Sequence, residues 1–392
     1  MISTYSELTD DKLDWVINIA EGTYTGAAKF SFSGDSNIKS LTIEGAGSDK
    51  TIFDGGFTED NPGNTLTLSA KAITLSNVKV TGGYTNKNGA GIYLGNGALT
   101  ANNVIISGNT GTGNGNYGAG TGAGIYISSN AVFIMNGGTI TNNVGTYGGG
   151  VRNCGTMFMY GDAVIGNKNA NSSAVYDETT PENNAFGNRA EIGGGIYSDG
   201  NLYLGYSGFD SDGTTPLPAD FSGGIYQNFA DAEGGGIYLN TWQSVYMNSG
   251  TIAYNKGSQG SGVWTTIGNN TYNVICGLFM SGSALITSNN DVYLNSYYDS
   301  SKRIYYYAYL YVTGELTSTE EKVAYITPNP YNNGRKVVYI TEDSGINFGP
   351  DGTEEAATAA AAFYNKFAVT QEDEETGIWS IDNSGNITYT EN

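Results

Sequence analysis

The sequence predicts an all-β protein, a right-handed parallel β-helix with roughly 10–11 coils, on three observations. A glycine-led block recurs along the middle of the chain, and an asparagine block recurs in phase with it. Between the two blocks lie short runs in which apolar residues alternate, a pattern with period two that indicates strands and not helices. Right-handed winding follows from the general preference of parallel crossover connections.

The glycine block has small residues at three successive positions, then an aliphatic residue, then a large side chain. Its third glycines lie 33, 26, 45, 41 and 26 residues apart, so a unit of 26 residues with insertions explains the spacing. Glycine at such a corner supplies positive φ and lets neighbouring backbones approach closely. The copies are Gly89 to Tyr93, Gly122 to Tyr126, Gly148 to Arg152, Gly193 to Tyr197, Gly234 to Tyr238 and Gly260 to Trp264.

The asparagine block places an aliphatic residue three positions before an asparagine. Asparagine tolerates the left-handed region and can hydrogen-bond from coil to coil, so the block predicts a ladder of side chains at a second corner. The copies are Ile106/Asn109, Ile140/Asn143, Val164/Asn167, Ile225/Asn228, Ile252/Asn255 and Ile286/Asn289.

One coil then consists of three short strands and three turns, and each strand pairs with its counterpart one coil later at a spacing of about 4.8 Å. The aliphatic residue of each glycine block points inward and builds a continuous core. These residues are Ile92, Ile125, Val151, Ile196, Ile237 and Val263.

The two ends are expected to cap the coils, because an open sheet edge invites aggregation. We divide the chain into an N-terminal cap over residues 1–15, the β-helix over 16–345 and a C-terminal cap over 346–392. The first cap is expected to contain a short helix from Ser3 to Asp14. The last cap is expected to contain a helix over Thr353 to Phe367 and a hairpin that pairs residues 378–381 with 387–389.

Charge and composition exclude several classes of partner and chemistry. The chain has 17 basic and 38 acidic residues, a net charge of −21, so nucleic acid and anionic lipid surfaces would repel it. It contains no apolar stretch of 18 residues, so we expect no membrane span in this chain. Histidine is absent, which excludes every mechanism that needs an imidazole base or metal ligand.

The acidic residues do not suggest a catalytic centre. Polysaccharide lyases and glycosidases with this fold place two or three carboxylates on neighbouring central coils. Between Gly63 and Tyr176 the only acid is Asp162. We therefore name no catalytic residue and favour a non-enzymatic role, with a carbohydrate-active enzyme on a pectate-lyase-like β-helix as the alternative.

No cofactor is predicted, and Ca²⁺ has only weak candidates. Asp210 and Asp212 are carboxylates on alternate residues before Gly213, as in a calcium loop, but the distal acid that such a loop requires is missing. A solvated turn is the favoured interpretation. Cys154 and Cys276 lie about three coils apart by repeat phase, roughly 14 Å, so we expect two free, buried thiols.

The two longest repeats carry insertions around residues 170–185 and 205–220, in neighbouring coils. Solenoids place function in such insertions, so we expect both loops to leave the rod and to form a joint cleft.

The candidate binding residues follow the inward aliphatic residue of each glycine block and should point outward, because strand side chains alternate. They form a predicted ladder for a glycan or a protein on another cell surface, with packing between neighbouring strands as the competing explanation. A second aromatic run, at Tyr305, Tyr307, Tyr309 and Tyr311, should share one face. The ladder residues are Tyr93, Tyr126, Arg152, Tyr197, Tyr238 and Trp264.

The two recurring blocks resemble the Gly-Gly-Ala-aliphatic and Phe-x-x-Asn repeats of polymorphic outer-membrane proteins and other adhesin-like autotransporter passengers. The resemblance covers about residues 16–345, with isoleucine or valine in place of phenylalanine and mostly glycine in place of alanine. It implies an extracellular β-helix on the bacterial cell surface, with a role in adhesion or cell-envelope architecture.

Overall fold

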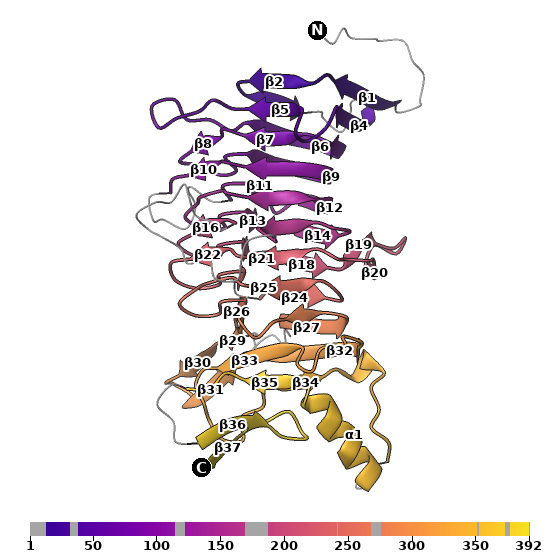
Figure 1. The fold of residues 1–392 in the computed structure, drawn as a ribbon, viewed down its shortest axis with the longest axis vertical. Helices are drawn as coiled ribbons and strands as arrows, with labels where there is room; N and C mark the ends of the chain where they lie inside the picture. Colours follow the sequence, from indigo (N-terminus) through magenta and orange to yellow (C-terminus); the bar gives the residue numbers. More distant parts are fainter. Residues whose placement is uncertain are drawn as a thin grey trace.

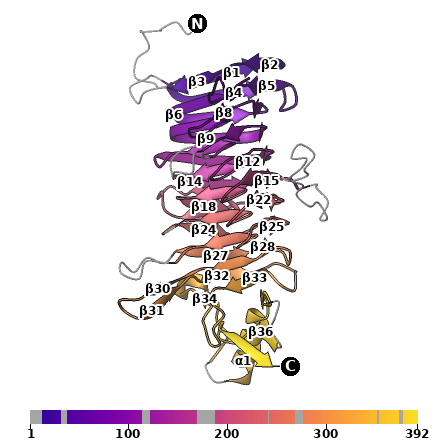
Figure 2. The same ribbon diagram turned by 90° about the vertical axis from the view of Figure 1, so that its left-hand side faces the viewer.

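The computed structural model describes residues 13–31, 38–113, 122–168, 187–240, 242–267, 276–350, 353–372 and 377–391. Twenty-seven of its strands belong to one sheet, in which the pairings are parallel. Figures 1 and 2 show the strands stacked along the long axis, with the amino end at one extremity and α1 (Glu354–Tyr364) at the other. The predicted all-β architecture with a large parallel sheet is confirmed.

Three stacks of strands run along the rod, and the chain passes through them in turn. The glycine-side stack contains the strand that follows each glycine block. Its members pair in parallel in the order β3 (Ala28–Ser31), β6 (Leu66–Ser76), β9 (Ile92–Ser107), β11 (Ile125–Ile127), β13 (Val151–Asn153), β17 (Ile196–Ser198), β23 (Ile237–Leu239), β26 (Val263–Thr265), β29 (Val292–Leu294), β33 (Ala324–Pro328) and β35 (Phe367–Val369).

The middle stack follows next along the chain. It shares the long strands β6 and β9 with the glycine-side stack. Its other members are β1 (Leu13–Ile19), β4 (Ile38–Gly45), β12 (Ala131–Thr141), β14 (Thr156–Tyr160), β18 (Asn201–Leu204), β24 (Ser244–Met247), β27 (Gly277–Gly282), β32 (Leu310–Leu316) and β34 (Val338–Ile340).

The asparagine-side stack precedes the asparagine corner and shares β9 and β12. Its other members are β2 (Gly22–Thr25), β5 (Thr51–Asp54), β7 (Lys79–Thr81), β15 (Val164–Gly166), β21 (Gly224–Tyr226), β25 (Thr251–Ala253) and β28 (Leu285–Ile286). Past this corner lie two short parallel pairs, β8 (Tyr84–Thr85) with β10 (Thr110–Gly111) and β16 (Arg189–Ala190) with β22 (Phe229–Ala230).

The core lies between the three stacks. All six aliphatic residues of the glycine blocks are buried, with at most 1% of their surface exposed, and each pairs with the next. The predicted inward column is therefore confirmed. Near the amino end, where the chain lacks the glycine block, apolar residues also form strands, in β1, β4 and β6.

The asparagine ladder exists, with two members different from those predicted. Five side-chain amides each donate to the carboxamide oxygen of the next ladder member at 2.9 Å, and the ladder ends at Asn290, which only accepts in it; its members are Asn109, Asn143, Asn188, Asn228, Asn255 and Asn290. Asn167 is not in the ladder, because the insertion lies between β15 and the corner and moves the ladder position to Asn188. Asn289 is replaced by Asn290, since the Asn289 side chain turns away to accept from the Tyr254 backbone N–H at 3.0 Å.

The third glycine of each block packs directly against this ladder. A Cβ added to Gly195 would lie 2.6 Å from the carbonyl oxygen of Gly236 and 3.0 Å from the side-chain nitrogen of Asn228. The first glycine of each block has φ between 63° and 70°, as in Gly193 at 68°, which a side chain rarely adopts. The two sequence blocks therefore form the two sides of one close contact.

The ends of the rod differ in part from expectation. Leu13 and Asp14 belong to strand β1, so the predicted N-terminal helix is wrong at these positions, and residues 1–12 lie outside the described part. At the other end, helix α1 and the antiparallel hairpin of β36 (Gly377–Ile381) and β37 (Ile387–Glu391) confirm the predicted elements. Thr353 caps the helix by accepting from the Ala356 N–H at 3.1 Å. A single 3₁₀ turn, η2 (Glu342–Ser344), precedes it.

Both cysteines are free thiols, as predicted. Pairing of β14, β18, β24 and β27 places them three steps apart along the middle stack, about 14 Å. Cys276 is buried, and burial raises the pKa of its thiol. Cys154 is only half-buried, so the prediction of two buried thiols is wrong for that residue.

The described residues do not bring the two insertions together in the predicted joint cleft. Residues 169–186 of the first insertion lie outside the described part, but the ends that flank them meet, because a Cβ on Gly187 would lie 2.1 Å from the Gly166 Cα. The second insertion is an antiparallel hairpin of β19 (Tyr206–Phe209) and β20 (Pro216–Pro218). Figure 1 shows this hairpin on the side of the rod opposite β16, the strand that follows the first insertion. The two insertions start from different corners, which separates them.

We predict that Gly195→Ala strongly destabilises the protein, by more than about 2 kcal/mol, because the added Cβ overlaps a carbonyl and the asparagine ladder at once. Gly95→Ala is the matched control, since the closest contact of its Cβ would be the edge of Tyr93 at 3.3 Å and its other neighbours lie at 3.6 Å. Denaturant unfolding monitored by circular dichroism measures the difference. Equal midpoints for the two variants would contradict the proposed contact.

Candidate binding surface

The six predicted ladder residues lie in one row on the outside of the glycine-side stack. Backbone pairing puts each beside the next, from Tyr93 through Tyr126, Arg152, Tyr197 and Tyr238 to Trp264, and extends the row to Tyr293. The sequence-predicted register is therefore confirmed for all six. We call this row the glycine-side ladder.

The exposure of this ladder is uneven. Tyr93, Tyr126, Tyr238 and Trp264 are half-buried, whereas Arg152 and Tyr197 are buried, with 9% and 1% of their surface exposed. The expectation that every member is a surface residue is therefore wrong for these two. Tyr147, from the preceding loop, packs edge-on against the Tyr197 ring at 5.5 Å and helps to cover the centre of the row.

The rings of the ladder stack on one another along the rod. Centroids of Tyr93 and Tyr126 are 5.5 Å apart, and those of Tyr238 and Trp264 are 4.5 Å apart, with planes inclined by 11° in both pairs. Their stacked faces are thus occupied by neighbouring rings. A sugar ring cannot stack between members of such a column. It could stack only at the end of one.

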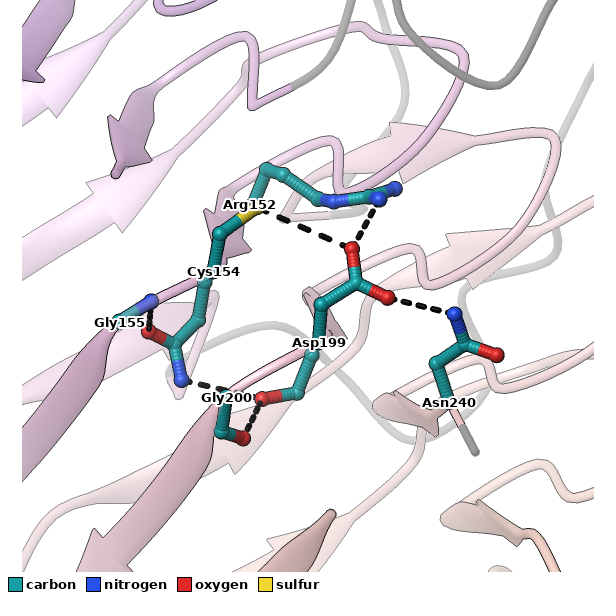
Figure 3. Close-up of polar contacts among 8 residues, drawn as sticks. Arg152, Cys154, Gly155, Asp199, Gly200 and Asn240 are labelled. Carbon is teal, nitrogen blue, oxygen red and sulfur yellow. Dashed lines mark hydrogen bonds and ion pairs between the residues drawn. The ribbon is translucent and has the colours of Figure 1, made fainter. Parts of the chain in front are cut away.

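Arg152 is the centre of a polar cluster, which Figure 3 shows. Its guanidinium lies 3.9 Å from the centroid of the Tyr197 ring and forms an ion pair with Asp199, which follows β17. The other oxygen of Asp199 accepts from the Asn240 side chain at 2.5 Å, and the Cys154 sulfur lies 3.7 Å from the first oxygen. These groups come from three successive coils and hold them together.

The electrostatics of the cluster favour the ion pair. Burial acts to lower the pKa of Arg152, but the interactions with Asp199, Cys154 and Tyr197 together outweigh it and the pKa is raised. Within the described residues, Nε and Nη1 of Arg152 have no hydrogen-bond partner, so the guanidinium is held by one carboxylate and by the aromatic face beneath it. Asp199 is already engaged by several donors, which suits a structural carboxylate.

A second aromatic ladder, which the sequence interpretation missed, runs along the outside of the middle stack. Its neighbouring rings are paired in register, with centroids 4.8–4.9 Å apart and planes within 19° down to Tyr311. The sequence contains a pattern that could have predicted this ladder, because in successive repeats an aromatic residue lies between two buried aliphatic residues. The members of this middle ladder are Phe158, Tyr203, Tyr246, Phe279, Tyr311 and, at 6.0 Å, Tyr339.

The predicted aromatic run from Tyr305 to Tyr311 does not share one face. Tyr305 and Tyr307 belong to a hairpin of β30 (Ser296–Asp299) and β31 (Ile304–Tyr307) that leaves the stack. Tyr311 lies in β32, as a member of the middle ladder. The predicted alternation of side chains applies within each of the two segments. The chain, however, passes from the β30–β31 hairpin into the stack between Tyr307 and Tyr311.

The β19–β20 hairpin covers the upper end of the middle ladder. Phe209 packs edge-on against Phe158 at 5.0 Å and against Tyr203 at 5.3 Å. At the hairpin tip, Asp212 accepts from the backbone and hydroxyl groups of Thr214 and Thr215 at 2.6–3.0 Å. A hydrogen bond with the Asp210 side chain, followed by these threonine donors, lowers the pKa of Asp212. The two calcium candidates therefore form a closed turn. The described residues contain no group of three acids or cysteines that could hold a metal ion.

The described part of the chain contains no helix long and apolar enough to cross a bilayer. A scan against protein-family models, a search of curated proteins and a search of solved structures each found no match to this chain. The function must therefore be inferred from the geometry.

We predict that Tyr203 contributes to a loss of stability at alkaline pH. Burial, then the neighbouring phenols of Tyr246 and Tyr206, raise the pKa of Tyr203 from about 10 to about 12. Because the folded-state pKa lies above the unfolded value, this contribution is fully present below pH 10 and is lost as the pH rises toward 12. Denaturant midpoints between pH 8 and 12 should fall more for the wild type than for Tyr203→Phe, which keeps the ring and cannot ionise. Parallel curves for the two proteins would contradict the assignment.

Proposed function

We propose that this chain is a right-handed parallel β-helix that acts as a rigid, non-enzymatic protein of the adhesin-like or cell-envelope type on the surface of a bacterial cell. Three parallel stacks traversed in turn by 26-residue repeats support the β-helix assignment. The recurring glycine and asparagine blocks support the resemblance to autotransporter passengers.

The observation that carries this proposal is the pair of aromatic ladders outside the apolar core, of which the glycine-side ladder is interrupted by Arg152. Each stacked pair of rings contributes about 0.5–1.5 kcal/mol beyond its buried area. Two such columns on different faces couple neighbouring coils and oppose bending of the rod. Stiffness of this kind suits a protein that must hold a contact surface away from a cell.

The proposed contact surface for a glycan or protein of another cell is the glycine-side ladder. A partner would meet the half-buried rings of Tyr93, Tyr126, Tyr238 and Trp264, the first three of which carry phenol hydroxyls, while the buried Arg152 and Tyr197 lie between them in the row. Burial, then the neighbouring Cys154, raises the pKa of Tyr126, so its hydroxyl is a neutral donor and acceptor at physiological pH.

The test is to remove the hydroxyls without removing the rings. The triple variant Tyr93→Phe, Tyr126→Phe, Tyr238→Phe should keep its melting temperature within about 2 °C, because stacking is retained. Binding of the purified protein to arrayed glycans, matrix proteins and intact cells should weaken at least about tenfold through lost hydrogen bonds. Tyr24→Phe, an exposed tyrosine outside both ladders, is the control.

Unchanged binding by the triple variant would show that the ladder serves packing alone. Release of reducing ends or unsaturated sugars from polysaccharides by the wild-type protein would contradict the non-enzymatic assignment.

A further inference from the structure

A cleft lies at the foot of the β19–β20 hairpin, at the corner between the middle and asparagine-side stacks. It encloses about 750 Å³ and opens to solvent. Figure 1 shows the hairpin projecting from the rod beside β18, and Pro218 at the end of β20 lines the cleft. The lining residues are Pro218, Ala219, Asp220, Phe221, Ser222, Asn248, Ser249, Gly282, Ser283 and Thr317.

The cleft extends along the rod. Its lining residues follow β18, β24, β27 and β32, four successive members of the middle stack. Three steps of about 4.8 Å give a length of about 14 Å, which matches about three sugar units of an extended glycan. A single small metabolite would leave much of this length empty.

The chemistry of the lining is neutral and rich in hydroxyl groups. Four hydroxyls and one amide line the cleft, and each hydroxyl can both donate and accept a hydrogen bond. Ser249 and Ser222 donate to backbone carbonyls at 3.4 and 3.3 Å, so their lone pairs remain as acceptors. Sugar hydroxyls have the same dual capacity, which makes this lining complementary to them.

The charge of the lining residues restricts the class of ligand further. Among the described lining residues, the exposed Asp220 is the only charged one, and none of them is a lysine or an arginine. With a net charge of −21 on the whole chain, a uronate, sulfate or phosphate would be repelled. Pro218 and Phe221 supply apolar surface against which the C–H face of a neutral pyranose can pack.

We propose that this hairpin cleft binds a neutral oligosaccharide of about three units, laid along the rod axis. The site is independent of the glycine-side ladder, because it lies at a different corner and uses none of its residues. Either site can fail its test without affecting the other.

Ser283→Trp tests the proposal by filling the cleft from an exposed position. The control is Ser288→Trp. Ser288 is an exposed serine that follows the short strand β28, whereas Ser283 precedes it. The probes are neutral cello-, malto-, manno- and xylo-oligosaccharides of two to six units, with oligogalacturonate and heparin as charged comparators. Affinity is measured by calorimetry or by an immobilised array.

We expect the wild type and Ser288→Trp to bind at least one neutral series, with affinity that stops rising beyond about three or four units. Ser283→Trp should bind it at least about tenfold more weakly. Thr317→Trp blocks the far end of the cleft and provides a second variant if the first folds poorly. It should remove the advantage of longer oligosaccharides and leave disaccharide binding unchanged.

Three results would overturn the proposal. The first is a wild type that binds no neutral oligosaccharide, the second is a wild type that binds only the charged comparators or a peptide, and the third is equal binding by Ser283→Trp and Ser288→Trp.

Discussion

A column of buried asparagines holds the coils in register, and the other features of this molecule depend on it. In the centre of the column, each side-chain nitrogen donates to the next asparagine and to a backbone carbonyl. Each side-chain oxygen accepts from a side chain and from a backbone N–H. For Asn228 these partners are Asn255, the Ile165 carbonyl and both nitrogens of Asn188. A buried amide left without such partners costs about 1–3 kcal/mol per group, so any slip of one coil against the next is unfavourable.

Fixed register explains why the outside of the rod carries ordered rows. Because every coil begins at the same corner, a residue at one position in the repeat lies beside its counterpart in the next coil. Aromatic residues at two such positions therefore become stacked ladders, and Arg152 with Asp199 and Asn240 becomes a link through three coils. Extra residues can leave the rod at the corners without disturbing the pairing, as the β19–β20 hairpin does.

The sequence was sufficient for the architecture because glycine and asparagine mark the two sides of one contact. It also placed all six members of the glycine-side ladder in the correct row. It could not show that Arg152 and Tyr197 are buried, since Tyr147 covers them from a loop whose course has no periodic signal. Asn188 was missed because an insertion separates it from its aliphatic partner, so a rule based on a spacing of three selected Asn167. The hairpin cleft was also missed, because it is built from corner residues of four coils that share no motif.

The most direct test of this account compares Asn228→Ala with Asn167→Ala in denaturant unfolding. Asn228 lies in the buried column, and its loss removes the acceptor of the Asn188 backbone N–H and a donor to the Ile165 carbonyl. Asn167 belongs to the same sequence block pattern but lies outside the column. The account predicts that Asn228→Ala destabilises the protein by about 3 kcal/mol or more and that Asn167→Ala costs less than about 1 kcal/mol. Equal losses, or a larger loss for Asn167→Ala, would contradict the claim that the asparagine column sets the register.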